Sequence, residues 1–368
     1  MGRGQYSRGM QRRPGDVADA TKAGVDDATK TGVGDAIRTG VGDARRASAD
    51  GAYVIGVDVG GTSTKLGRYR PGAGDLEGFR SLPTGAGRAP AEVLADLAAA
   101  IRDLAAAAAG TAVALGVGVP ATLSRDGRIE VLPNFAPGWR GLDVAASLGD
   151  ATGLPAVAVN DARAFTLAEA RLGAAAGARS AFGVTLGTGV GGGLVIDGRL
   201  HLGESGNAGE FGHHVHDPHG PRCGCGSHGC IEVYASAPAL VAAVMRPFAQ
   251  GAAPVLARLA GGRRDAVTPA LIAEAAAAGD PICADALDRV ALVLGVALAN
   301  VTTLVSPERF VIGGGMANLG DALFVPLRRI LAAYAPTAGE RLPTIVPAAL
   351  GERAGALGVA LHALDAVG

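Results

Sequence analysis

Two stretches far apart in the chain share one pattern, in which an apolar strand, a glycine turn and a second apolar strand follow one another. The first is AYVIGVDVGGTSTKLGRY at residues 52–69, and the second is SAFGVTLGTGVGGGLVIDG at residues 180–198. β-Branched residues on both sides of a glycine turn are typical of paired strands. The recurrence predicts two related halves of an α/β fold, each built from a mixed sheet with helices on its faces.

The other apolar segments fit this plan. Helices are expected at residues 90–109, 162–173, 236–249, 268–278, 281–303, 319–334 and 354–368, and strands at 112–120, 155–161, 309–317 and 344–350. Hydrophobic residues make up 49% of the 368 residues, which is enough for two domains with a substantial core. No segment has the length and apolarity of a membrane span, and the net charge of −1 argues against a nucleic-acid partner.

Residues 1–50 have a different composition from the rest. The octets DATKAGVD, DATKTGVG, DAIRTGVG and DARRASAD follow one another, and large apolar side chains are almost absent. Such a segment cannot build a core, so we expect a disordered repetitive tail. An amphipathic helix is disfavoured by its glycines, and a translation start placed too far upstream would look the same. No apolar run of a secretory signal follows the first arginines, so a cytoplasmic protein with reduced thiols is expected.

The turn DVGGTSTK at residues 58–65 has features of an anion site. It is neither a Walker loop nor GxGxxG, because the spacing differs and a strand follows it. Its adjacent glycines let the backbone approach an anion, Thr62 and Thr64 offer hydroxyls, and Asp58 is a candidate carboxylate beside a metal. Lys65 is the only lysine after residue 30. A plain hairpin turn is an equally good interpretation of this segment alone.

Two further glycine runs favour a nucleotide. LGTGVGGG at residues 186–193 gives a second Gly/Thr turn, as expected when backbone amides from two lobes hold a polyphosphate, and IGGGMA at 312–317 suits a purine or ribose. The three motifs resemble the two phosphate motifs and the adenosine motif of the sugar kinase, actin and heat-shock ATPase superfamily. The resemblance implies two ribonuclease-H-like domains around a cleft that binds Mg-ATP. The candidate nucleotide contacts are Asp58, Gly60, Gly61, Thr62, Lys65, Gly187, Thr188, Gly189, Gly313, Gly314 and Gly315.

Residues 210–234, EFGHHVHDPHGPRCGCGSHGCIEVY, concentrate three of the four cysteines and five of the seven histidines. Cys223, Cys225 and Cys230 form C-x-C-x4-C, in which a disulfide across C-x-C would be strained. Three thiolates and one imidazole make a closed tetrahedral set, which favours a structural zinc ion over free thiols. The spacing alone leaves the histidine ligand open among His213, His214, His216, His219 and His228.

The same stretch resembles the signature of the ROK family, which includes repressors, open reading frames and kinases. The pattern E-x-G-H, six residues, G, two residues, C-x-C-G-x-x-G-C-x-E is complete here as Glu210, Gly212, His213, Gly220, Cys223, Cys225, Gly226, Gly229, Cys230 and Glu232. The resemblance implies zinc on His213, Cys223, Cys225 and Cys230. It also implies that Glu210, His213 and Glu232 face sugar hydroxyls, held in place by the zinc loop.

A candidate base for the sugar hydroxyl is Asp161. Asn160 and Asp161 follow an apolar strand and precede a helix, where helix capping is the ordinary interpretation. In ROK kinases such a pair supplies a sugar contact and the catalytic base, which the resemblance carries to Asn160 and Asp161. Asn134, in LPNFAPGW, resembles a segment that lines the sugar pocket, although a turn next to prolines explains it nearly as well. Trp139 is expected in the core.

The sequence therefore predicts a ROK-type kinase that transfers the γ-phosphoryl group of Mg-ATP to a hexose, with glucose as the preferred candidate. Fructose, mannose, allose and the N-acetylated hexosamines are alternative substrates, and a sugar-sensing regulator or an inactive sugar-binding protein are alternative functions. The expected layout is a tail at 1–50, a smaller domain at 51–160 joined by the helix at 354–368, and a larger domain at 161–353 with the zinc motif at 210–232. A homodimer or homotetramer is implied by the resemblance.

Overall fold

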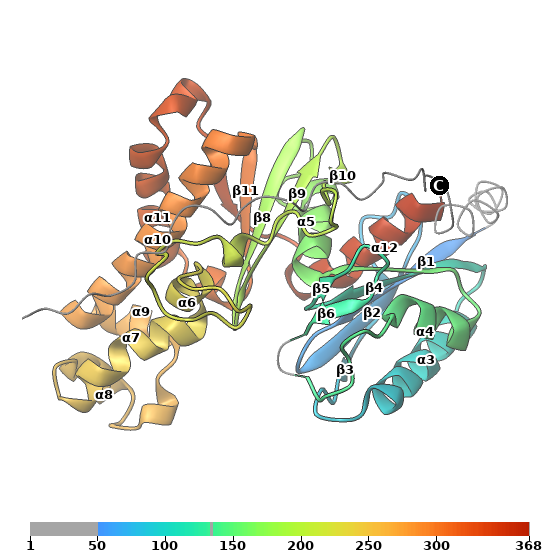
Figure 1. Cartoon of the computed structure of the whole chain (residues 1–368), viewed down its shortest axis with the longest axis horizontal. Helices are drawn as coiled ribbons and strands as arrows, with labels where there is room; N and C mark the ends of the chain where they lie inside the picture. Colours follow the sequence, from blue (N-terminus) through green and yellow to red (C-terminus); the bar gives the residue numbers. More distant parts are fainter. Residues whose placement is uncertain (1–50, 133–134, 368) are drawn as a thin grey trace, which may run out of the picture.

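The computed structural model describes residues 51–132 and 135–367, and in this part the chain forms two five-stranded sheets with helices packed on them (Figure 1). The predicted tail at 1–50 and Asn134 lie outside the described residues. The two glycine turns predicted to join paired strands do so, and the α/β class is confirmed. Within the described ranges, no helix is both long and apolar enough to cross a membrane.

The first sheet is a mixed sheet near the N-terminus. From edge to edge its strands are β3 (Glu77–Pro83), β2 (Ser63–Tyr69), β1 (Tyr53–Val59), β4 (Ala112–Val119) and β7 (Ala156–Asn160). The first three pair antiparallel, and β4 and β7 run parallel to β1. One face packs on α3 (Pro90–Ala106) and α4 (Val144–Thr152), and the other on α12 (Ala354–Val367). Gly56 allows the close approach of α12, because a Cβ there would collide with the carbonyl of Ala356.

The second sheet repeats this arrangement. Its strands are β10 (Arg199–Leu200), β9 (Val190–Ile196), β8 (Ser180–Leu186), β11 (Arg309–Gly313) and β12 (Thr344–Pro347). β8 and β9 are antiparallel, and β11 and β12 run parallel to β8. α5 (Asp161–Arg171) packs on β8 and β9. The large core beside this sheet contains apolar side chains from α7 (Ala237–Ala249), α9 (Pro269–Ala277), α10 (Pro281–Val305) and α11 (Asp321–Tyr334).

Helices α5 and α12 pack against each other and link the two sheets (Figure 1). Glu169 on α5 is fully buried, and its carboxylate accepts hydrogen bonds from the N–H groups of Ala349 and Leu350 at 2.8–3.1 Å. These bonds fix the segment between β12 and α12. The order of the chain thus brings its last helix back onto the first sheet.

Short elements complete the structure. They are β5 (Thr122–Leu123), β6 (Ile129–Val131), α6 (Glu232–Ala235), α8 (Pro254–Leu259), and the 3-10 segments η1 (Phe211–His213), η2 (Arg264–Ala266), η3 (Gly315–Leu319), η4 (Pro336–Arg341) and η5 (Gly351–Arg353). The strand expected at 309–317 ends at Gly313, because Gly314 has a φ of 83° and a 3-10 turn follows. Trp139 is buried against the ring of Phe135, as predicted for a core residue.

Candidate active site

The Asn160–Asp161 pair lies where β7 ends and α5 begins. The Asn160 side chain caps the helix, because its Oδ1 accepts hydrogen bonds from the N–H groups of Ala162 at 3.0 Å and Arg163 at 3.3 Å. Its Nδ2 donates to the carbonyl of Ala121 at 3.2 Å. Asn160 is therefore the N-cap residue, and Asp161 is the first residue of the helix. Asp161 Oδ1 also accepts a hydrogen bond from the N–H of Ala162 at 2.8 Å, which leaves Oδ2 of its carboxylate for another role.

Asp58 is near the end of strand β1 and Asp161 directly follows β7, so both carboxylates stand at strand ends of the first sheet, and the charge of Asp58 acts on Asp161. Burial raises the pKa of Asp161 to about 7, and the negative charges of Asp58 and Glu210 act in the same direction against Arg163. Burial also raises the pKa of Asp58 to about 6, although Lys65 opposes this. A carboxylate whose pKa is near neutral can accept a proton from a hydroxyl more readily than an ordinary one. Asp161 thus has the electrostatics expected of a general base.

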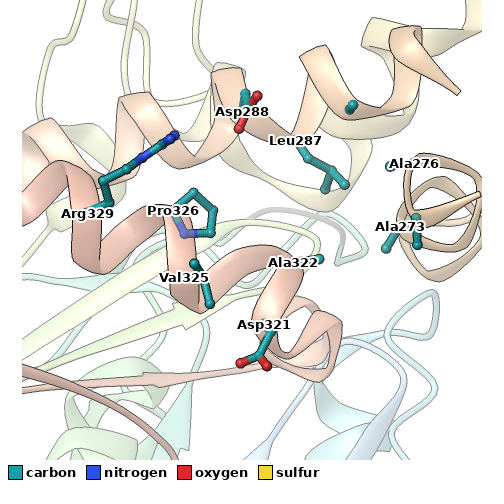
Figure 2. A pocket seen from close by; sticks show the side chains of 11 residues that line it. Ala273, Ala276, Leu287, Asp288, Asp321, Ala322, Val325, Pro326 and Arg329 are labelled. Atoms are coloured by element: carbon teal, nitrogen blue, oxygen red, sulfur yellow. The ribbon is translucent and has the colours of Figure 1, made fainter. Parts of the chain in front are cut away.

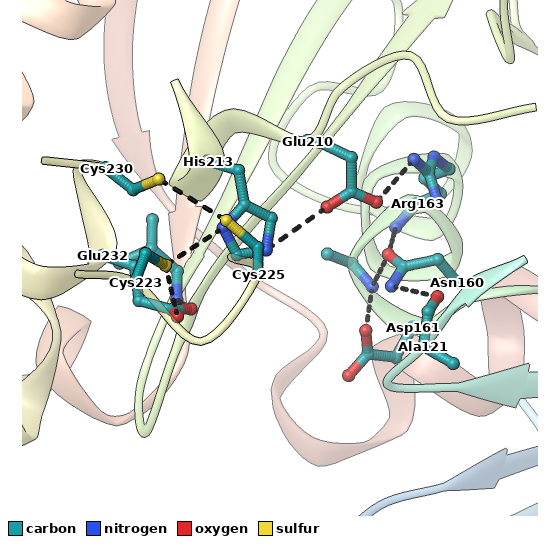
Figure 3. A network of polar contacts seen from close by, with 12 residues as sticks. Ala121, Asn160, Asp161, Arg163, Glu210, His213, Cys223, Cys225, Cys230 and Glu232 are labelled. Atoms are coloured by element: carbon teal, nitrogen blue, oxygen red, sulfur yellow. Dashed lines mark hydrogen bonds and ion pairs between the residues drawn. The ribbon is translucent and has the colours of Figure 1, made fainter. Parts of the chain in front are cut away.

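Glu210 is held by an arginine that the sequence analysis did not identify. Arg163, on the first turn of α5, donates from Nη2 to Glu210 Oε1 at 2.8 Å and from Nε to the carbonyl of Ala208 at 3.0 Å. The other oxygen of Glu210 lies 3.9 Å from His213 Nε2. Figure 3 shows Glu210 between Arg163 and His213. Asn160 and Asp161 lie at the N-terminal end of α5, the helix that carries Arg163. The fold therefore brings four predicted site residues close together, namely Asn160, Asp161, Glu210 and His213.

His213, Cys223, Cys225 and Cys230 form a cluster that fits zinc. Their four ligand atoms lie within 4.8 Å of one another. His213 Nδ1 and Cys223 Sγ are 3.7 Å apart, as are the sulfurs of Cys225 and Cys230. A tetrahedral zinc ion with Zn–S bonds of about 2.3 Å separates two sulfurs by about 3.8 Å, whereas a disulfide needs about 2.05 Å. The geometry matches the metal, and all four cysteines of the chain are free.

The histidine ligand can now be selected. His213 presents Nδ1 to the sulfurs and turns Nε2 toward Glu210. A metal-bound histidine commonly orients its second nitrogen toward a carboxylate in this way. His214, His216, His219 and His228 are all exposed and do not belong to the cluster.

Glu232 connects the cluster to the second glycine turn. Its Oε2 accepts a hydrogen bond from the N–H of Val190 at 3.0 Å, directly after Gly189, and its Oε1 lies 3.9 Å from Cys223 Sγ. A Cβ at Gly189 would come within 2.6 Å of the same carboxylate. The carbonyl of Gly187 accepts from the N–H of Ala237. The loop that holds the cysteines therefore also fixes the β8–β9 turn.

The glycine turns divide into open and packed positions. Gly61, Gly187 and Gly315 have open space where a Cβ would stand, and Thr62 and Thr188 are exposed. Gly313 is buried against the ring of Phe165, so its missing side chain serves packing.

The structure does not support the prediction that Thr64 offers its hydroxyl to an anion. It is fully buried, and its hydroxyl is 2.8 Å from that of Thr84. Thr84 also donates to the carbonyl of Gly60 at 2.7 Å. Thr64 therefore stabilises the β1–β2 turn. Its hydroxyl is not free to bind a ligand, because it is buried and hydrogen-bonded to Thr84.

A cavity of about 490 Å³ lies between α9, α10 and α11. Small apolar side chains line much of it, including Ala273 and Ala276, with Asp288, Asp321 and Arg329 among the charged groups (Figure 2). Helix α9 packs against η3, which begins at the third glycine run. The cavity is thus next to the predicted adenosine motif and separate from Asp161.

The comparisons with known proteins agree on one family. A model of the ROK family matches residues 54–366. The chain is 34% identical over 310 residues to a glucokinase from Streptomyces coelicolor, which covers 83% of this chain and 96% of that protein. It is 34% identical over 320 residues to a kanosamine kinase from Amycolatopsis mediterranei, with 86% and 98% covered.

One solved structure with a similar fold contains two bound ligands. It is a ROK family glucokinase from Streptomyces griseus in complex with glucose and AMPPNP. Its TM-score with this chain is 0.72, at 33% identity, with 85% of this chain and 99% of that chain covered.

Proposed function

This chain belongs to the ROK family, and from that premise we propose that it transfers the γ-phosphoryl group of ATP to the 6-hydroxyl of glucose. It is an ATP-dependent sugar kinase, as are the glucokinases to which it is similar over most of its length. The observation that carries the choice of chemistry is Asp161. Its carboxyl has a pKa near 7 and lies within reach of the charge of Glu210, which is fixed by Arg163.

The proposed mechanism assigns one task to each group. Asp161 accepts the proton of the attacking hydroxyl, while Asn160 and Glu210 orient the sugar by hydrogen bonds. The open backbone around Gly61 and Gly187 receives the phosphates, because unsubstituted N–H groups can approach an anion closely. Most of the rate enhancement in phosphoryl transfer comes from such positioning and charge stabilisation.

Two ions belong to this proposal. Mg²⁺ would accompany ATP and neutralise charge on its phosphates, with Asp58 as the residue to hold it. Zinc on His213 and the three cysteines would be structural and would take no part in the phosphoryl transfer. It would keep the loop that carries Glu210 and Glu232 in a fixed conformation.

We assign the cavity between α9, α10 and α11 to the base of the nucleotide. Its alanine side chains are small enough to leave room for an aromatic ring, and it lies beside η3, which follows Gly313 and Gly314. The phosphates would then extend from the third glycine run toward the β8–β9 turn. A Cβ at Gly314 would come into contact with the backbone of Leu186, so the two segments are neighbours.

We also propose a layout for the whole protein. The first sheet with α12 would form one domain (51–160 and the last helix), the second sheet and its helices another (161–353), and the sugar would bind in the cleft between them. Closure of such domains excludes water from the reaction. A cytoplasmic homodimer or homotetramer is the expected state.

The test is a coupled assay that follows ADP formation with Mg-ATP over a panel of sugars. The panel contains glucose, fructose, mannose, allose, N-acetylmannosamine, N-acetylglucosamine and kanosamine. Glucose should give the highest kcat/KM, and the product should be glucose 6-phosphate. A higher kcat/KM for kanosamine would transfer the assignment to amino sugars, and transfer to none of the panel would reject the kinase proposal.

A further inference from the structure

Arg163 is a buried cation near the proposed base. Its side chain is 2% exposed, although it belongs to the first turn of a helix whose end faces the site. A charged group is buried only where partners replace its hydration. Here the partners are Glu210 Oε1 at 2.8 Å and the carbonyl of Ala208 at 3.0 Å. Both partners belong to the segment that precedes η1, about 45 residues further along the chain.

The two bonds fix the orientation of Glu210. Nε and Nη2 form a rigid planar fork, so the guanidinium holds the carboxylate and the backbone of Ala208 at the same time. One oxygen of Glu210 is thereby committed, and the other is left to face His213 Nε2 and the sugar. Without the fork, Glu210 would regain rotamer freedom, because it is only partly buried and follows Gly209 in a left-handed conformation.

The same cation acts on Asp161. The charged groups that raise the pKa of Asp161 are Asp58 on β1 and Glu210 before η1, while Arg163 lowers it. Lys65 on β2 acts on Asp58. Arg163 therefore acts on the pKa of Asp161 in the direction opposite to burial and the two carboxylates, as the N–H of Ala162 also does.

We propose that Arg163 is a positioning residue, which orients Glu210 toward the sugar and keeps that contact in register with Asp161 on the same helix. This inference rests on the proposed kinase function. It differs from a plain structural ion pair, which would contribute to stability and leave substrate affinity and the pH profile unchanged.

Two variants separate the effects of geometry and charge. Arg163→Lys keeps the charge but cannot form the fork, so KM for glucose should rise by about 10-fold or more with the acid limb of the pH–rate profile unmoved. Arg163→Met also removes the charge, which raises the pKa of Asp161 and moves the acid limb to higher pH. Arg171→Met is the matched control, because Arg171 is on the same helix and pairs with Asp365, away from Asp161.

Glucose binding by calorimetry, zinc content and melting temperature are measured beside the kinetics. Weaker glucose binding by zinc-loaded, folded Arg163→Lys, together with a control that keeps the wild-type KM, supports the proposal. A wild-type KM and glucose affinity in Arg163→Lys overturns it, and so does an equal loss in Arg171→Met. If Arg163→Met does not fold, Arg163→Lys decides alone. Failure of the wild-type protein to phosphorylate glucose would instead reject the proposed function.

Discussion

Asp161 is the residue on which the proposed chemistry depends most directly. Replacing it by Asn keeps the oxygen that accepts the N–H of Ala162 at 2.8 Å and removes only the basic carboxylate. kcat should fall by a factor on the order of 10² to 10⁴, the usual contribution of a general base. Helix capping is unaffected, because Asn160 provides it. A folded, zinc-loaded Asp161→Asn protein with near-wild-type kcat would remove Asp161 from the mechanism.

The same substitution should stabilise the protein at neutral and alkaline pH. Burial and Asp58 raise the pKa of Asp161 from 3.8 to about 7, so ionisation of this group costs folding free energy. The cost is absent below the unfolded pKa, grows as pH rises between the two pKa values, and is complete above about pH 7. The melting temperature of Asp161→Asn should therefore exceed that of the wild type at about pH 8, with little difference at about pH 4. An equal melting temperature at both pH values would contradict the raised pKa.

Some of these residues could be found from the sequence and others could not. The spacing of Cys223, Cys225 and Cys230 restricts them to a common small volume, so a metal cluster was predictable. Arg163 gave no such signal, because its partner is 47 residues away and the contact depends on how α5 packs on the second sheet. The prediction of a free hydroxyl at Thr64 is wrong, because only the folded structure brings this residue to Thr84.

The loop between η1 and α6 is the element whose conformation depends most on a metal. Cys225→Ser removes one of the four candidate ligands, and the free energy of zinc binding that stabilises the folded loop falls with it. Zinc should fall from about one equivalent to a small fraction, with lower melting temperature and lower activity. Cys283→Ala is the control, because Cys283 is buried in α10 outside the cluster. Normal activity in a wild-type preparation that contains no zinc would exclude the metal site.

Helix α9 should control affinity for the nucleotide. Ala276 lines the cavity beside α11 and is partly exposed, so Ala276→Phe can fill the space without disturbing the core. KM for ATP should rise by about 10-fold or more, with KM for glucose unchanged, because the sugar contacts are on α5 and the zinc loop. Ala278→Phe, on the exposed end of the same helix, is the matched control. An unchanged KM for ATP in Ala276→Phe would place the base elsewhere.

The elements themselves differ in how far the sequence predicts them. The hairpins β1–β2 and β8–β9 were predictable, because each glycine turn lies between runs that favour strands. Helix α4 was not expected, since it has nine residues and buries only Val144, Ala145 and Leu148. Its bounds come from the cap Asp143 and the left-handed Gly153, which are weak signals without the fold around them.

At the scale of the whole molecule, the chain order does not follow the order of the sheets. β7 completes the first sheet, α5 then packs on the second, and α12 returns to the first at the end of the described chain. α12 packs on the first sheet and α5 packs mainly on β8 and β9, so the contact between these two helices joins the two sheets. Sequence periodicity predicts each helix but gives no information on which sheet it covers, because that choice depends on long-range packing.

The fold should be complete without residues 1–50, which contribute almost no large apolar side chains to a core. The match to the ROK family begins at residue 54, strand β1 begins at Tyr53, and the carbonyl of Gly51 accepts a hydrogen bond from Arg70 Nη1 at 2.6 Å. Deletion of residues 1–50 should therefore leave kcat, KM and melting temperature unchanged. Deletion of residues 1–54 is the contrasting variant, because it removes the buried Tyr53 and its bond to the carbonyl of Ala105 at 3.1 Å. That variant should melt several degrees lower, as expected for the loss of a buried aromatic side chain. A large loss of turnover on deletion of residues 1–50 alone would give the repeats a role in catalysis.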